Sequence, residues 1–183
     1  MSILVAILGL IFLVVLYFVF LYNNLATMKV RIEEAWSQID VQLKRRIDLI
    51  PNLVDTVRGY ADHERGVFEQ VSKARSALMN AEGPQEAGQA EGQLEGALKS
   101  LFAVAEDYPE LKAQENFSQL QEELSDTEDK IAYARQFFNA TVKDYNSKIV
   151  TFPNNIIANM LGFERKEFFE VDEAERDVPE VDL

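Results

Sequence analysis

The chain has 183 residues, with 18 lysines and arginines against 31 aspartates and glutamates, which gives a formal net charge of −13. Nucleic acid and anionic lipid headgroups repel so acidic a protein, which excludes both as electrostatic partners. The absence of cysteine excludes disulfide bonds and thiol chemistry, and a single histidine, His63, removes most metal-binding and acid–base designs.

Residues 3–22, ILVAILGLIFLVVLYFVFLY, contain no charge, amide or proline. As a helix rising about 1.5 Å per residue, this run spans roughly 30 Å, the thickness of the hydrocarbon core of a bilayer. It is apolar on every side, so no polar face would let it lie on a membrane surface or a soluble core. We therefore predict a single transmembrane anchor over residues 1–23. Its membrane-anchor side chains include Ile3, Leu4, Leu10, Leu16, Tyr17 and Tyr22.

A cleaved signal peptide is the alternative interpretation of this run. Signal peptides have a basic start, an apolar region of roughly 7–15 residues and a small-residue cleavage site. Here Met1 and Ser2 are not basic, the run is too long, and the sequence Leu21-Tyr22-Asn23-Asn24 offers no such site. We therefore expect the anchor to be retained.

The flanks of the anchor predict its orientation. Lys29 and Arg31 follow the run, and no basic side chain precedes it. Because lysine and arginine near a span favour the cytoplasmic side, we expect a single-pass protein of the cell (inner) membrane with its soluble domain in the cytoplasm.

An amphipathic helix is predicted after the anchor, because apolar or amphipathic residues recur in steps of three and four. These positions are Ile32, Trp36, Ile39, Leu43, Ile47, Ile50, Val54, Val57 and Ala61. No proline or glycine separates the two segments, so the membrane helix should continue into the first bundle helix. Pro51 removes one backbone hydrogen bond, and Asp48 is placed to cap a new helix. We expect a kink or break near residues 47–51, and leave open whether the chain reverses there.

The triplet Lys44-Arg45-Arg46 is the one notable basic cluster. Pairing with the many acids of the domain is the favoured interpretation. Contact with the membrane surface is the alternative, and it requires the chain to turn back near Pro51. Further along the chain, the triplet Asp62-His63-Glu64 is interpreted as a polar helix rim.

The next helix is predicted from about Gln85 to Glu106, after a loop at residues 79–86, and leucines mark one of its faces. Gly88, Gly92 and Gly96 recur every four residues on roughly the opposite side. Glycine costs about 1 kcal/mol against alanine inside a helix, so three of them need a reason. Either this half of the helix is poorly formed and faces solvent, or it is a close-approach face for another helix, including one from a second copy of the chain.

The longest apolar pattern runs from Phe117 to Phe152 without a proline or glycine between Asn116 and Val150. It predicts one helix of about 50 Å. The buried positions should be Phe117, Leu120, Leu124, Thr127, Ile131, Ala134, Phe138, Thr141, Tyr145, Lys148 and Phe152. Asn139 and Asn146 lie one heptad apart and are candidates for holding register against a neighbouring helix.

An apolar cluster follows the Phe152-Pro153 pair, around Arg165 and Lys166. Its members are Ile156, Ile157, Met160, Leu161, Phe163, Phe168 and Phe169. It is expected to fold back over the open end of the bundle, and contact with lipid or a protein partner is the alternative. Residues 170–183 are acidic and are predicted to form a flexible tail.

The chain resembles the LemA family of bacterial membrane proteins over nearly its whole length. The resemblance rests on Glu33-Glu34-Ala35-Trp36, DVQLKRRIDLIPNLVDTVRGYADHE (40–64), ARSALMNA (74–81), LKSLFAVAEDYPELKAQENFSQLQEELSDTE (98–128), IAYARQFFNATVKDYN (131–146) and FPNNIIANMLGF (152–163). It implies one N-terminal membrane helix, a soluble antiparallel bundle of the bromodomain-like type over residues 24–169, and no established activity or catalytic residues. The glycines at 88–92 depart from this pattern, because helix formers are expected there.

The fold class is therefore predicted as all-α, with a transmembrane helix and an up-and-down four-helix bundle. Paired Glu-x-x-His motifs, a phosphate-binding loop and a Ser-His-Asp set are all missing, so we predict a non-catalytic scaffold without cofactor or metal. Its expected partners are the lipid bilayer and other membrane or envelope proteins, or a second copy as a homo-oligomer, and not nucleic acid. The candidate interaction residues are Gly88, Gly92, Gly96, Ile156, Ile157, Met160, Leu161 and Phe163. The alternative is a carboxylate-based metal-binding enzyme or sensor.

Overall fold

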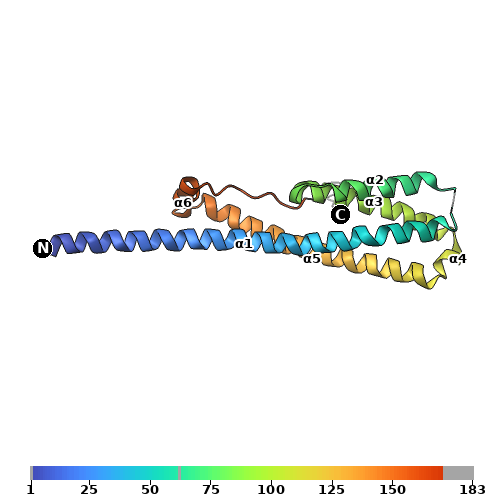
Figure 1. The fold of residues 1–183 in the computed structure, drawn as a ribbon, viewed down its shortest axis with the longest axis horizontal. Helices are drawn as coiled ribbons and strands as arrows, with labels where there is room; N and C mark the ends of the chain where they lie inside the picture. Colours follow the sequence, from blue (N-terminus) through green and yellow to red (C-terminus); the bar gives the residue numbers. More distant parts are fainter. Residues whose placement is uncertain (1, 62, 171–183) are drawn as a thin grey trace, which may run out of the picture. The chain divides into compact units, whose positions relative to one another are not determined.

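The structure is a computed structural model that describes residues 2–61 and 63–170. It confirms the all-α fold, since the described residues form six helices and no strand (Figure 1). The helices are α1 (Ser2–Arg58), α2 (Arg65–Met79), α3 (Gly83–Glu106), α4 (Pro109–Lys112), α5 (Glu115–Val150) and α6 (Asn154–Leu161). The predicted flexible tail lies outside the described residues, apart from Glu170.

The chain forms two compact units. The anchor unit comprises residues 1–37 and 136–167, and so contains the first part of α1, the last part of α5, and α6. Of the described residues, the bundle unit comprises 38–61, 63–135 and 168–170, and so contains the remainder of α1 and α5 with α2, α3 and α4.

The N-terminal end of α1, up to residue 20, is apolar and exposed, and Figure 1 shows it without a neighbouring helix from the rest of the anchor unit. Every residue from Ile3 to Phe20 is exposed, whereas Leu21 and Leu25 are 7% and 0% exposed. Among the described residues this is one helix long and apolar enough, by length and composition, to cross a membrane. Burial therefore begins where the predicted span ends.

Helix α1 continues from the apolar segment without interruption to Arg58, which confirms that the predicted span and the first bundle helix are one helix. A kink or break was expected near residues 47–51, and the helix is not broken there. Pro51 lies inside the helix and cannot donate to the carbonyl of Ile47, four residues earlier. Arg75 of α2 supplies the missing donor, with its Nε 2.9 Å from that carbonyl oxygen. The chain reverses only after Arg58.

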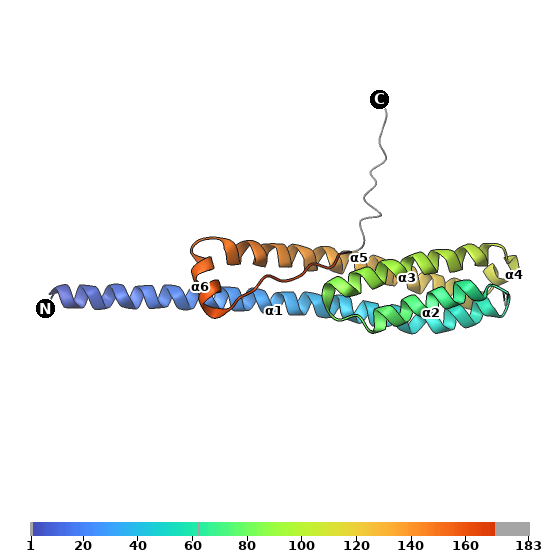
Figure 2. The ribbon, with the colours of Figure 1, turned by 90° about the horizontal axis from the view of Figure 1, so that it is seen from above.

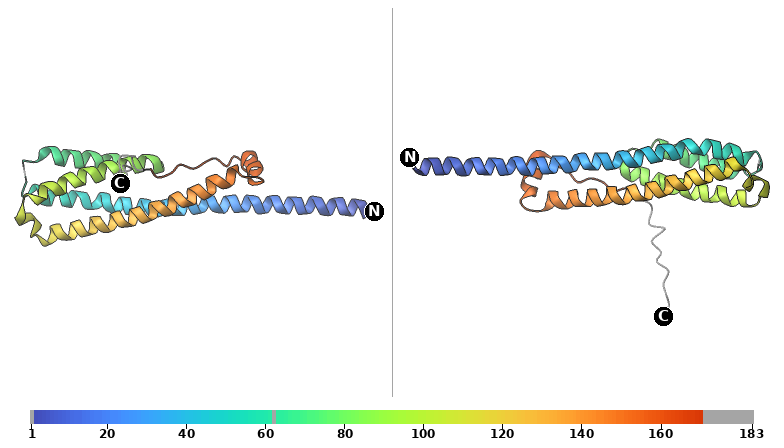
Figure 3. Two further views of the ribbon diagram at one scale, coloured as in Figure 1. Left: turned by 180° about the vertical axis from the view of Figure 1, so that it is seen from behind. Right: turned by 90° about the horizontal axis from the view of Figure 1, so that it is seen from below.

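The bundle unit is an up-and-down arrangement of α1, α2, α3 and α5, with α4 in the connection from α3 to α5 (Figure 2). The connections are short, which places successive helices antiparallel. Figures 2 and 3 both show α2 and α3 side by side. The α1 side of the core is formed by Ile39, Leu43, Arg46, Ile47, Ile50, Leu53 and Val57. The predicted apolar spacing identified most of these residues, but not Leu53 or Arg46.

The anchor unit packs the end of α5 antiparallel against α1. The Trp36 and Phe138 rings lie 5.8 Å apart between centroids, and the Tyr22 and Phe163 rings lie 6.0 Å apart, edge to face. Figures 1 and 2 both place α6 beside α1, beyond the end of α5. The segment after α6 thus reaches the level of Tyr22, where the predicted span ends.

Helix α5 confirms the single long helix, but its buried stripe differs from the predicted one near the C-terminal end. Val142 and Ile149 are buried, whereas Thr141 and Lys148 are half-buried and Phe152 is 75% exposed. A strict alternation of three and four repeats every 3.5 residues, and a straight α-helix drifts by about 20° per heptad against that repeat. After three heptads the drift is about 60°, more than half of the angle of about 100° between successive residues, so the buried position moves to the next residue.

Candidate functional site

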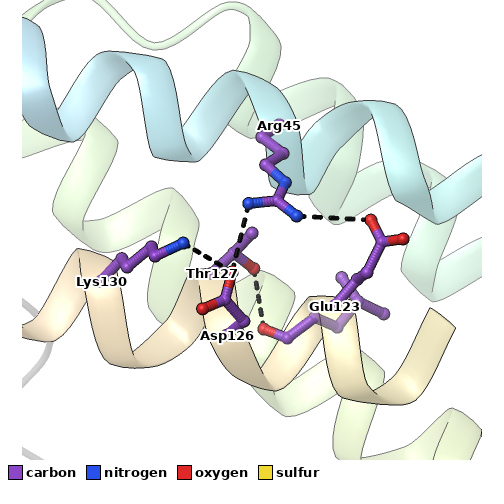
Figure 4. Close-up of polar contacts among 6 residues, drawn as sticks. Arg45, Glu123, Asp126, Thr127 and Lys130 are labelled. Carbon is purple, nitrogen blue, oxygen red and sulfur yellow. Dashed lines mark hydrogen bonds and ion pairs between the residues drawn. The ribbon is translucent and has the colours of Figure 1, made fainter. Parts of the chain in front are cut away.

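Arg45 of α1 joins a group of exposed ion pairs in the bundle unit (Figure 4). Its guanidinium lies 3.1 Å from the Asp126 carboxylate and 3.5 Å from that of Glu123. Lys130 also binds Asp126, at 2.8 Å. This hydrogen bond from Lys130, with the charges of Lys130 and Arg45, lowers the pKa of Asp126 below its ordinary value. These side chains are between two-fifths and one-half exposed, so the two ion pairs of Arg45 hold α1 to α5 only weakly, and the Lys130–Asp126 pair lies within α5.

Arg46, the next residue of α1, forms a buried ion pair with Glu91 of α3. The two side chains are 3% and 6% exposed, and Nη1 lies 2.6 Å from Oε1. Glu128 of α5 approaches the same guanidinium at 3.8 Å. Burial raises the pKa of Glu91, although the charge of Arg46 opposes the shift. Within the described part of the chain, Arg46 Nε and Glu91 Oε2 have no hydrogen-bond partner.

The favoured interpretation of the basic triplet is thus confirmed, because each of its members pairs with an acid, Lys44 with Asp40. The burial of Arg46 was missed, although its spacing carried a signal. Arg46 lies three residues after Leu43 and four before Ile50, which places it on the core face of α1. Glu91 lies three residues before Leu94 and four after Ala87, on the core face of α3. The pair ties the core faces of α1 and α3 together.

The three predicted glycines do not share one environment. Gly88 is buried, and a Cβ added there would overlap the backbone carbonyl of Glu170. Gly92 is half-buried, whereas Gly96 is exposed with nothing within 4 Å of an added Cβ. The interpretation of a poorly formed, solvent-facing half-helix was wrong, because α3 begins at Gly83 and buries Ala87, Gly88, Ala90 and Glu91. The close approach at Gly88 is to a non-helical segment of the same chain.

The segment after α6 is fixed to α5 by polar contacts. The Tyr145 hydroxyl donates to the Glu164 carbonyl at 3.0 Å, and burial raises the pKa of this tyrosine. The Asn146 side chain pairs with the backbone of Lys166 as another strand would, accepting from its N–H and donating to its carbonyl, both at 2.8 Å. Asn146 therefore holds an extended segment in place, where a neighbouring helix had been expected.

Helix α6 buries only part of the predicted apolar cluster. Ile157 and Ala158 are buried and Phe163 is half-buried against Tyr22, so the segment does fold back within the anchor unit. Ile156, Met160 and Leu161 remain 49%, 62% and 50% exposed. The predicted membrane-anchor side chains Ile3, Leu4, Leu10, Leu16, Tyr17 and Tyr22 are all exposed.

Two further observations concern ligand and metal binding. A surface groove on the bundle unit collects the cationic side chains of Arg58, Arg65 and Lys73, with Arg58 5.2 Å from the centre of the Phe68 ring. Over residues 2–61 and 63–170, no group of three or more histidine, aspartate or glutamate side chains is placed to hold a metal ion. The interpretation of residues 62–64 as a helix rim was wrong for His63 and Glu64, which are exposed in the connection between α1 and α2, and Asp62 lies outside the described residues.

Comparison with known proteins gives consistent matches. The model of the LemA family matches residues 35–183. Protein LemA of Metamycoplasma hominis is 31% identical over 168 residues, covering 88% of this chain and 75% of that protein. Magnetosome protein MamQ of Magnetospirillum gryphiswaldense is 29% identical over 174 residues, and Magnetosome protein MamQ 1 of Paramagnetospirillum magneticum is 27% identical over 175. Both alignments cover 81% of this chain and only 64% of the MamQ protein.

Proposed function

The chain belongs to the LemA family, and on that premise we propose that it is a single-pass membrane protein whose helical bundle acts as a non-catalytic scaffold for other membrane or envelope proteins. One observation carries the proposal. The apolar segment that meets the requirements of a membrane span and the packed part of α1 belong to one helix, with no flexible linker between them. A loosely tethered enzyme domain does not need such a junction, whereas a scaffold held at the bilayer surface does.

The interior of the bundle supports a structural role. Its buried positions are mainly aliphatic and aromatic, and its buried charges, Arg46 and Glu91, pair with each other. The lowered pKa of Asp126 is likewise explained by its ion pairs. Perturbed pKa values at catalytic sites usually accompany a cleft and an available reactive group, and these two carboxylates are engaged instead in interhelical pairs.

Membrane anchoring is tested by carbonate extraction of membranes from cells producing the full chain. We expect the protein to stay with the membrane pellet. Replacing Leu10 and Val14 by arginine puts two charges at mid-span, each costing about 2.5–3.5 kcal/mol, and should release the protein. Replacing the same residues by alanine is the matched control and should leave it in the pellet.

The scaffold role is tested by cross-linking in membranes, followed by affinity purification and mass spectrometry. We expect a reproducible set of membrane or envelope proteins. A glycine-serine insertion after Asn24 interrupts α1 and should reduce their recovery, whereas the same insertion after Ala81, between α2 and α3, should not. An unchanged set with both insertions would show that the junction is irrelevant. A lack of reproducible partners, together with stoichiometric metal binding, would contradict the scaffold proposal.

We propose in addition that the soluble part lies in the cytoplasm, as Lys29 and Arg31 suggest. Because the chain has no cysteine, one introduced at the exposed Tyr133 provides a unique reporter. A membrane-impermeant maleimide should label Tyr133→Cys in permeabilised cells only. Labelling in intact cells would reverse the proposed orientation.

A further inference from the structure

Helix α6 has an unusual surface for a helix of a water-soluble fold. Its sequence, NNIIANML, contains no charged residue. It buries Ile157 and Ala158, while Ile156, Met160 and Leu161 are about half or more exposed, and Phe152 just before it is 75% exposed. Four large apolar side chains are thus exposed within ten residues, a concentration that marks an interaction surface.

The position of α6 within the anchor unit bears on what covers this surface. The edge-to-face contact of Phe163 with Tyr22 joins the end of α6 to the last residue of the predicted span. The hydrogen bonds of Tyr145 and Asn146 hold the following residues against α5, so this contact is one part of a fixed arrangement. Tyrosine at the end of a span lies at the headgroup level. The exposed side chains of α6 are therefore at the same level.

We propose that α6 is an interfacial helix whose exposed residues Phe152, Ile156, Met160 and Leu161 insert into the lipid bilayer beside the anchor. This inference rests on the proposed membrane anchoring. Helices of this kind lie with their apolar face roughly 5–10 Å into the boundary between headgroups and acyl chains. Since α6 has no charge and the whole chain is acidic, the contact is apolar rather than electrostatic. The exposed apolar surface and the level of Tyr22 together favour lipid over a second copy of the chain.

Because the chain contains no cysteine, a single introduced cysteine can be labelled at a chosen position. Single cysteines at Met160 and Ile156 in the full chain are labelled with a small fluorophore, and the protein is reconstituted in vesicles of phosphatidylcholine and phosphatidylglycerol. Spin-labelled lipids that quench either near the headgroups or near the bilayer centre then report depth. Both positions are already exposed, so the substitutions remove little packing.

Two further positions act as controls. Leu10→Cys lies in the middle of the span and reports anchoring. Gln136→Cys is exposed on α5, close to the Phe138–Trp36 contact, and Trp36 lies 14 residues beyond Tyr22 on α1, or about 21 Å along the helix. We expect the labels at residues 160 and 156 to lose most fluorescence to the shallow quencher, Leu10→Cys to the deep one, and Gln136→Cys to neither.

The outcomes separate the two proposals. Quenching at residue 10 without quenching at residues 156 and 160 would overturn the interfacial helix and leave the anchor intact. A label at residue 10 that neither quencher reaches would overturn the anchor, and the inference with it. Self-quenching at residue 160 that grows with the protein-to-lipid ratio would show that a second copy covers α6, which also overturns the proposal.

Discussion

Arg75 donates its Nε–H to the backbone carbonyl of Ile47, at 2.9 Å, across 28 positions of the chain. In an α-helix that carbonyl accepts from the residue four positions later, which here is Pro51. The side chain of α2 thus completes the hydrogen bonding of α1 at the one place where its own backbone cannot. This contact explains how α1 continues through a proline that otherwise ends or kinks a helix.

Replacing Arg75 by methionine should therefore destabilise the protein through Ile47 rather than through lost charge. A half-buried carbonyl left without a donor costs about 1–3 kcal/mol. In a Pro51→Ala background the backbone N–H at position 51 is restored, so the same Arg75 substitution should cost clearly less. Guanidinium unfolding of the full chain in detergent micelles, followed by circular dichroism, measures all four proteins of this cycle. Equal costs in the two backgrounds would show that Arg75 acts elsewhere.

The fold followed from local signals, because apolar spacing, glycine and proline act over one or two turns. They predicted the all-α fold, the continuity of α1 beyond Tyr22 and the single helix α5. The course of α1 at Pro51 was not predictable in this way, because its compensating donor lies on another helix. The close approach at Gly88 depends on Glu170, which is just as remote in sequence.

The features of the candidate site also separate into those that local sequence signals predicted and those that depend on contacts between remote residues. Composition alone identified the apolar span, since length and the absence of charge are properties of one segment. Sequence did not predict which side of α6 is exposed, with Met160 exposed and Ile157 buried. That depends on how α6 packs in the folded anchor unit, where Phe163 contacts Tyr22. The burial of Arg46 could have been predicted from its position between Leu43 and Ile50 on the core face of α1. A charged residue at a core position indicates a partner on another helix, but sequence does not say which acid it is.

Removing one member of the Arg46–Glu91 pair should destabilise the protein, whereas replacing both members by apolar residues should not. Arg46→Met leaves the Glu91 carboxylate buried without its cation and should cost about 3–5 kcal/mol of unfolding free energy. Combining it with Glu91→Leu removes both charges. The unfolding free energy of the double variant should equal that of the original protein or exceed it by up to about 4 kcal/mol. Chemical unfolding in micelles at neutral pH provides the comparison.

Arg45→Met is the matched control, since Arg45 is adjacent in sequence but its ion pairs are exposed. Its loss should change stability by only about 0.2–1 kcal/mol. If Arg45→Met and Arg46→Met proved equally costly, burial would not be what makes the inner pair important.

The raised pKa of Glu91 predicts a pH dependence with a definite sign. Burial is the main cause, and it lifts the pKa above the ordinary value of 4.5. The folded protein then binds this proton more tightly than the unfolded chain, so the stability that Glu91 contributes is fully present below pH 4.5 and is lost as the pH rises through the folded pKa. Glu91→Gln cannot titrate. Its unfolding free energy minus that of the original protein should therefore increase with pH across this window.

Asp126 supplies a comparison of opposite sign. Its pKa is lowered from 3.8, chiefly by the hydrogen bond from Lys130, so its contribution is present above pH 3.8 and is lost on acidification through the folded pKa. The unfolding free energy of Asp126→Asn minus that of the original protein should decrease as the pH rises towards 3.8. Both differences come from denaturant unfolding at a series of pH values. A flat difference for Glu91→Gln would mean that this carboxyl titrates alike in the folded and unfolded chains.

Substitution of two glycines of α3 should shift stability in opposite directions. At Gly88 an added Cβ overlaps the backbone of Glu170, so Gly88→Ala must displace that segment and should cost about 1–3 kcal/mol. At Gly96 nothing lies within 4 Å of an added Cβ. Alanine there should stabilise the helix by up to about 1 kcal/mol, because glycine is the poorer helix former. Thermal and denaturant unfolding of the two single variants, with the same chemical change on the same helix, isolates the effect of the close approach. Stabilisation by both substitutions would mean that the contact between α3 and Glu170 contributes nothing to the fold.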